Sequence, residues 1–205
     1  EAVLNYLARL GWSHGDEEIF SMEQFCAWFE FDHISSSAAQ FNTEKLNWLN
    51  AHYLKLADAG RLAGEVRQRL AAQGVDVASC PLLERVVALY KERAGNLNEL
   101  ADAVHPFCVA VHPAPELLAQ HLTEAVRTAL ASLRDQLAAL TETDWRAPAL
   151  SQAVKATLAG HAMKMPQLAI PLRVVLLGQP QSPALDAVLE VMGRERVLER
   201  LKRVL

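Results

Sequence analysis

Residues 43–58 read TEKLNWLNAHYLKLAD, and this stretch decides the fold class. Its apolar side chains return every three or four residues, which predicts an amphipathic α-helix of about four turns with one face in a core. The residues on that face are Leu46, Leu49, His52, Tyr53 and Leu56. We expect Leu49 and Tyr53 to be buried there, with Trp48 joining them from the edge of the face.

The same periodicity continues in both directions, so the whole chain is predicted to be all-α. Ser21 with Gln24, and Asn96 with Glu99, have the spacing of pairs that cap helix N-termini. The predicted helices cover residues 2–10, 22–29, 61–73, 79–93, 97–105, 116–140 and 144–160, with two more from Pro183 and Arg194. The Ser-rich residues 32–42 are predicted to form a loop, and residues 172–177 suit a strand or a helix. No sequence repeat is present, and a domain boundary is expected near residues 75–80 or near 145.

Composition places the chain among soluble globular proteins. It has 205 residues, of which 51% are hydrophobic and 21% charged. No apolar run reaches the roughly 18–20 residues that span a membrane, and the first residues lack the pattern of a signal peptide. The chain begins at Glu1 rather than Met and is already in a helical pattern, which suggests a piece of a longer protein.

The cysteines and histidines do not predict a metal site. Cys26, Cys80 and Cys108 are far apart and form no CxxC pair, and no HExxH or HxH motif occurs among the histidines. We therefore expect no bound metal, and three reduced, partly buried thiols.

Charge is distributed unevenly along the chain. Residues 1–145 carry 11 Lys and Arg against 20 Asp and Glu, a net charge of −9, whereas residues 146–205 carry 9 against 4, a net charge of +5. A basic end on an acidic body is typical of a protein that meets phosphates at one end only. A chance imbalance of surface charge accounts for the pattern equally well.

The sequence lacks the usual catalytic motifs. There is no GxxxxGK or GxGxxG phosphate loop and no GxSxG nucleophile elbow. The acidic run Asp16, Glu17 and Glu18 is typical of a solvated loop. We expect no catalytic residues within this chain, so a binding surface is the better hypothesis.

Two features near the C-terminus could form such a surface. Arg173 lies in the apolar segment IPLRVVLLG, where an unpartnered guanidinium would be costly. It is either a structural arginine that reaches solvent or a core carboxylate, or a rigid forked donor for a base edge or a phosphate. Ser182 and Pro183 have the pattern of a helix start, which either caps the helix or offers N–H groups to an anion.

Four blocks of the sequence resemble the C-terminal part of bacterial glutamyl-tRNA synthetases, which are class I aminoacyl-tRNA synthetases. The blocks are EAVLNYLARLGWSHGDEEIFS (1–21), FNTEKLNWLNAHYL (41–54), KMPQLAIPLRVVLLG (164–178) and SPALDAVLEVMGRERVLERLKRVL (182–205). The resemblance runs from end to end in the same order. It implies an all-α bundle or cage, with a stem-contact region at 1–78 and anticodon-binding subdomains at 79–145 and 146–205.

The resemblance also implies roles for individual residues. Arg173 would read the central anticodon base, and Ser182, Pro183 and Leu185 would line the pocket for the first and second bases. Arg93, in KERAGNLNEL, would contact the third base. Some positions depart from the family pattern in that a polar or cationic residue is missing or displaced; these are Ser36, Pro166, Gln167, Ile170 and Leu177. The departures leave Arg173 in place.

The function implied by the resemblance is recognition of tRNA(Glu) as part of a glutamate–tRNA ligase. The HIGH-like and KMSKS-like signatures of that family are absent, so we expect this chain to be inactive alone and to bind no cofactor, with ATP, Mg and glutamate held by the preceding catalytic domain. A cytoplasmic monomer that binds tRNA(Glu) and no membrane is expected. The alternative is an all-α protein–protein scaffold with no role in RNA binding.

Overall fold

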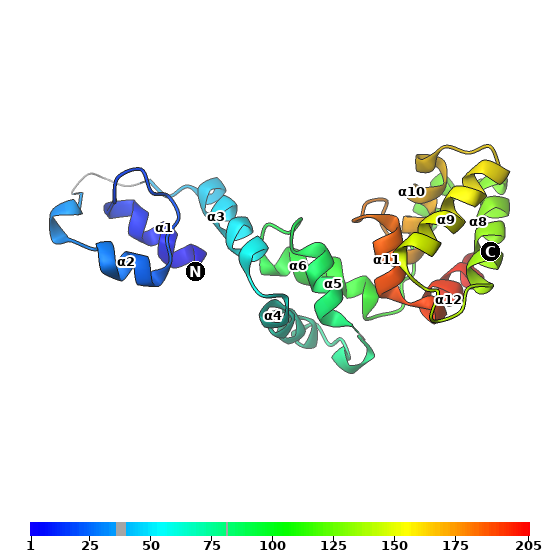
Figure 1. Cartoon of the computed structure of the whole chain (residues 1–205), viewed down its shortest axis with the longest axis horizontal. Helices are drawn as coiled ribbons and strands as arrows, with labels where there is room; N and C mark the ends of the chain where they lie inside the picture. The colour runs from blue at the N-terminus through cyan, green and yellow to red at the C-terminus, as the bar shows by residue number, and fades with distance from the viewer. Residues whose placement is uncertain (36–39, 81) are drawn as a thin grey trace.

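The computed structural model describes residues 1–35, 40–80 and 82–205, and this part of the chain is all-α, as predicted. It holds twelve α-helices, and its β pairing is an isolated bridge between Trp12 and Ile34. The helices form three groups in a row, which gives the molecule an elongated shape with the two termini in different end groups (Figure 1). Ser36, in the predicted Ser-rich loop, and Pro81, in the helix predicted over residues 79–93, lie outside the described residues.

The N-terminal group consists of α1 (Ala2–Gly11), α2 (Met22–Trp28) and α3 (Thr43–Leu56). The predicted capping box of α2 is confirmed, because Gln24 N donates to Ser21 Oγ and Ser21 N donates to Gln24 Oε1. Tyr53 is partly buried, and its hydroxyl lies 2.8 Å from Asn5 Oδ1 and 2.9 Å from the carbonyl oxygen of Phe20. The N-terminal group has a small hydrophobic core of its own, which consists of Ala2, Tyr6 and Leu49.

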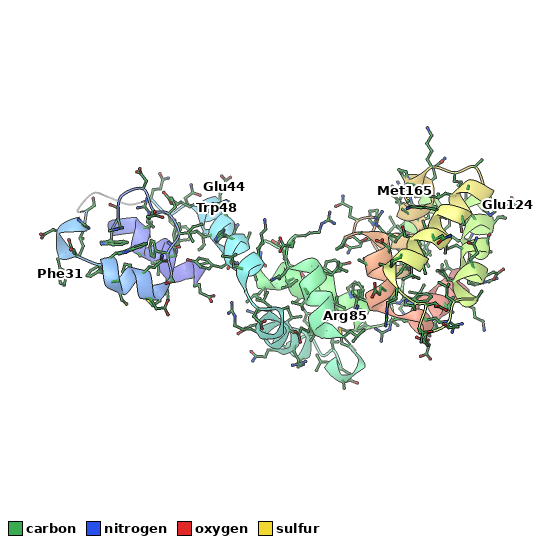
Figure 2. All side chains as sticks on the ribbon, in the orientation of Figure 1. Phe31, Glu44, Trp48, Arg85, Glu124 and Met165 are labelled. Atoms are coloured by element: carbon green, nitrogen blue, oxygen red, sulfur yellow. A yellow bond between two sulfur atoms is a disulfide. The ribbon has the colours of Figure 1, made fainter. Side chains whose placement is uncertain are left out.

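Two expectations about the faces of these helices are wrong. Trp48 is 53% exposed on α3, where Figure 2 shows it on the same stretch of helix as Glu44. Leu56, which was also predicted on the core face of this helix, is 70% exposed. The apolar Val3, Leu4 and Leu7 on α1 are likewise more than half exposed. Helical spacing marks an apolar face, but it does not say whether the described residues cover that face.

The middle group consists of α4 (Ala59–Ala72), α5 (Leu83–Tyr90) and α6 (Leu97–Val104), which pack against one another. Asp58 caps α4, and the predicted cap of α6 is confirmed because Asn96 Oδ1 accepts from the backbone N–H groups of Asn98 and Glu99. Helix α3 joins this group to the first, since Leu49 belongs to the N-terminal core and Leu54 to the main core.

The C-terminal group is a bundle of α7 (Pro115–His121), α8 (Glu124–Ala138), α9 (Ala147–Gly160), α10 (Met165–Leu177), α11 (Leu185–Met192) and α12 (Arg194–Val204). The main hydrophobic core runs without interruption from the middle group into this bundle. Residues 172–177 are helical, as part of α10, and Pro171 stands inside that helix. The main core therefore fixes the position of α5 relative to α10 and α11.

Several predicted helix boundaries are wrong. The helix expected over residues 116–140 is two helices, because Leu122 leaves helical geometry and Thr123 caps a new helix by accepting from Val126 N. The helix expected to start at Asp144 starts at Ala147, and the one expected over residues 79–93 covers only Leu83–Tyr90. Thr123 can cap a helix without any change in the spacing of the apolar residues. Hydrophobic periodicity alone therefore does not reveal the break between α7 and α8.

A buried arginine joins three segments of the bundle. Arg200 on α12 is 4% exposed and donates to the carbonyl oxygens of Pro106 at 2.6 Å, of Val109 at 2.8 Å and of Leu176. Burial lowers the pKa of Arg200 to about 10, so the guanidinium still carries its charge at neutral pH. The contacts hold the loop after α6, the end of α10 and α12 together.

The expectation of three reduced thiols is wrong in the structure. Cys80 and Cys108 form a disulfide that links the segment before α5 with the segment after α6, and Cys26 is free and exposed. The two cysteines are 28 positions apart in the sequence, and no motif connects them.

Counting thiols checks this pairing directly. In protein that is unfolded without reductant, we expect one reactive thiol, from Cys26, and three after reduction. Titration with a thiol-specific chromophore measures both numbers, and Cys26→Ser provides the control because it should lower each count by one. Three reactive thiols before reduction would contradict the disulfide.

The described ranges hold neither a membrane-spanning helix nor a cluster of metal-ligating side chains. No helix there is long and apolar enough to cross a membrane. No group of three or more His, Cys, Asp or Glu in those ranges could hold a metal ion.

Candidate nucleic-acid interface

Arg173 lies on α10 with its side chain partly buried where the C-terminal bundle meets the middle group. Its neighbours Leu172 and Val174 are fully buried, so the helix backbone on which Arg173 is mounted is held on both sides. Arg173 Nε donates to Ser182 Oγ at 2.8 Å. Burial, and then the positive charge of Arg93, lower the pKa of the Arg173 guanidinium.

Ser182 connects two arginines that are 80 positions apart in the sequence. Its hydroxyl accepts from Arg173 and donates to the carbonyl oxygen of Pro183 at 2.8 Å. Its own carbonyl oxygen accepts from Arg93 Nη1 at 2.6 Å. Arg93 follows the end of α5, so a single residue in the loop before α11 joins α5 to α10.

The predicted helix start at Ser182 and Pro183 is wrong. Helix α11 begins two residues later, at Leu185, and its N-cap residue Ala184 makes no side-chain cap. Because the Ser182 hydroxyl binds Arg173 and Pro183, it does not cap the helix. Pro183 is half-buried and Leu185 is buried, so both give the loop an apolar side next to the arginines.

The two arginines have no counter-charge in the described structure. Neither Arg93 nor Arg173 forms an ion pair with a described carboxylate, whereas other described arginines do, such as Arg9 with Glu18 and Arg85 with Glu190. For Arg173, the described hydrogen bonding uses Nε, and the Nη nitrogen atoms that form the outer fork have no described partner. Two adjacent cations with donors to spare are suited to a phosphate or to the acceptor edge of a base.

One side chain at this site gave no signal in the sequence. Tyr90 lies on the last turn of α5, is 4% exposed and is influenced by the charges of both Arg93 and Arg173. A tyrosine among apolar residues of a helix is typical of a core position, and the sequence contains nothing that distinguishes Tyr90 from one.

Other basic residues of the C-terminal segment have structural partners. Arg194 donates to the carbonyl oxygens of Leu140 at 2.8 Å and Ala138 at 2.7 Å, at the end of α8. Arg196 and Arg200 also bind backbone carbonyl groups. Residues 146–205 therefore keep their net charge of +5, but fewer of their basic side chains are free to reach a phosphate than the number of basic residues suggests. The exposed lysines of this segment are Lys155, Lys164 and Lys202.

Comparison with known proteins gives two family matches. A family model described as an anticodon binding domain matches residues 61–205, and one described as the catalytic domain of class I (E and Q) tRNA synthetases matches residues 1–48. The first match contains all five predicted site residues.

Individual relatives agree with the family matches. The chain is 66% identical over 203 residues to glutamate–tRNA ligases of Aromatoleum aromaticum and of an Azoarcus species, in alignments that cover 99% of the chain and 43% of each relative. The crystal structure of a glutamate tRNA ligase from Elizabethkingia meningosepticum in complex with its amino acid matches with a TM-score of 0.86 and 25% identity, over 100% of this chain and 40% of that one. The chain spans less than half the length of these relatives.

Proposed function

Since this chain belongs to the anticodon-binding domain family, in the form found in the C-terminal portion of glutamate–tRNA ligases, we propose that it recognises the anticodon loop and stem of tRNA(Glu). The observation that carries the proposal is the Arg93–Arg173 pair, which Ser182 ties together and which has no described carboxylate partner. Single-stranded anticodon bases can be splayed out and bound at their edges, and a planar guanidinium fork suits such an edge.

Each of the five residues has a role in this proposal. Arg173 reads the central anticodon base, and Arg93 contacts the third base. Ser182, Pro183 and Leu185 line the pocket for the first and second bases. Support comes from the geometry, because Ser182 contacts both arginines directly and Leu185 begins the helix that follows.

We also propose the division of labour along the chain. Residues 1–78 contact the tRNA stem, and residues 79–145 and 146–205 form two anticodon-binding subdomains. Within the whole protein, a cytoplasmic monomeric ligase, ATP, Mg and glutamate bind to the catalytic domain, of which the family match covers only residues 1–48 here. This chain alone then charges no tRNA and binds no cofactor of its own.

A titration tests the proposal. We expect this chain to bind a tRNA(Glu) transcript more tightly than the same transcript with its anticodon exchanged, by about tenfold or more, since each mismatched base contact costs about 1–3 kcal/mol. Affinity should fall as salt is raised, because phosphate contacts release counterions. Fluorescence anisotropy at two salt concentrations measures both effects. Equal, weak binding of both transcripts would contradict anticodon recognition and favour a scaffold.

A further inference from the structure

The hydroxyl of Tyr90 is buried without a partner. Tyr90 packs its ring edge-to-face against Phe107, with ring centroids 5.6 Å apart and 73° between the planes. The hydroxyl oxygen is buried and has no hydrogen-bond partner in the described residues. Phenylalanine would make the same ring contact without this cost, since a buried, unpaired polar group destabilises a fold by about 1–3 kcal/mol. Packing therefore explains the ring and leaves the hydroxyl unexplained.

The surroundings of the hydroxyl connect it with the arginine pair. Tyr90 and Arg93 are one turn apart, and Arg93 N donates to the carbonyl oxygen of Tyr90 at 2.9 Å. Ser182 joins Arg173 on α10 to Arg93, because its hydroxyl accepts from Arg173 and its carbonyl oxygen accepts from Arg93. The charges of both arginines act on the phenol. Burial raises the pKa of Tyr90 to about 12 against the opposing effect of these charges, so the phenol is neutral at physiological pH.

We infer that Tyr90 is a positioning residue of this site, whose buried hydroxyl holds the Arg173 guanidinium in the orientation in which it meets RNA. The inference rests on the proposed function. When Arg173 turns its outer nitrogen atoms toward a base, a guanidinium N–H that points away from the RNA can donate to the phenol oxygen, which has no other partner among the described residues. The hydroxyl carries a cost in the free protein because it acts in the complex, as is common at functional sites.

Tyr90→Phe separates this role from packing, because it removes only the hydroxyl. In the full-length protein, we expect affinity for a tRNA(Glu) transcript to fall about fivefold, the effect of one hydrogen bond, while the melting temperature stays the same or rises. Tyr53→Phe is the matched control. Its hydroxyl has described partners in Asn5 and Phe20, so this variant should melt at a lower temperature and bind the transcript as the wild type does.

A second background shows whether Tyr90 acts through Arg173. When Tyr90→Phe is added to Arg173→Ala, we expect no further loss of affinity, because the group that Tyr90 orients is gone. Additive losses would overturn the positioning role. Wild-type affinity in Tyr90→Phe, with normal discrimination against an exchanged anticodon, would overturn this inference and leave the proposed function intact. A wild-type protein that does not discriminate the two transcripts would instead overturn the proposed function itself.

Discussion

Replacing Arg173 with alanine is expected to weaken binding of tRNA(Glu) by about 5- to 150-fold, which corresponds to roughly 1–3 kcal/mol for one bidentate contact with a base. Nε of Arg173 is bound to Ser182 Oγ, and its outer nitrogen atoms have no described partner, so they are free to pair with a base. Arg173→Lys should not restore the affinity fully, because a point charge lacks the planar fork.

A double-mutant cycle assigns the contact. Arg173→Ala is combined with a change of the central anticodon base, in the full-length protein, with folding checked by thermal melting. The base change should cost little once Arg173 is absent, since both changes remove the same interaction. Arg134→Ala is the control, because that arginine pairs with Asp135 on α8 and has no predicted contact with RNA. Strictly additive losses would return Arg173 to the role of a structural arginine.

Arg200→Met is expected to lower the free energy of unfolding by about 3–5 kcal/mol, because it removes the hydrogen bonds that a charged donor makes to three carbonyl groups. Methionine keeps much of the length of the side chain but leaves three carbonyl groups without their donor, those of Pro106, Val109 and Leu176. Each buried acceptor that loses its partner costs about 1–3 kcal/mol, and burial of the new apolar side chain offsets part of this loss.

Urea unfolding measures the effect of the Arg200 variant. Arg203→Ala is the matched control on the same helix, because Arg203 is exposed and pairs only with Glu199 in the described hydrogen bonding, so its loss should cost less than about 1 kcal/mol. A loss below 1 kcal/mol for Arg200→Met as well would mean that the three carbonyl groups find other partners.

Local capping patterns in the sequence predicted two of the helix starts correctly. Ser21 and Asn96 cap their helices as expected, since each cap involves only residues within one turn. The break at Thr123 and the late start of α11 were missed. In the second case the Ser182 hydroxyl accepts from Arg173, which lies nine positions earlier on α10, and does not cap α11. Tertiary contacts therefore overrule a capping pattern that is locally sound.

The arginine site was predicted only through the family resemblance. The residues themselves left Arg173 open as a structural arginine, and nothing in KERAGNLNEL by itself connects Arg93 with Ser182. The structure brings these three residues together through packing between α5 and α11. Tyr90 was missed because burial of its hydroxyl without a partner is a property of the packed state, which residue type and spacing do not carry.

Helix α3 has a consequence for the proposed binding of tRNA. It belongs to both cores, and Asn50 and Ala57 tie it to the middle group through hydrogen bonds to Gly95 and from Lys91. Its 14 residues form a rod of about 21 Å that leads from the N-terminal group to the middle group, which Arg93 follows at the end of α5 (Figure 1). This rod would set the distance between the proposed stem-contact region and the proposed anticodon-binding subdomains, so a tRNA that engages both needs the matching spacing between its stem and its anticodon loop.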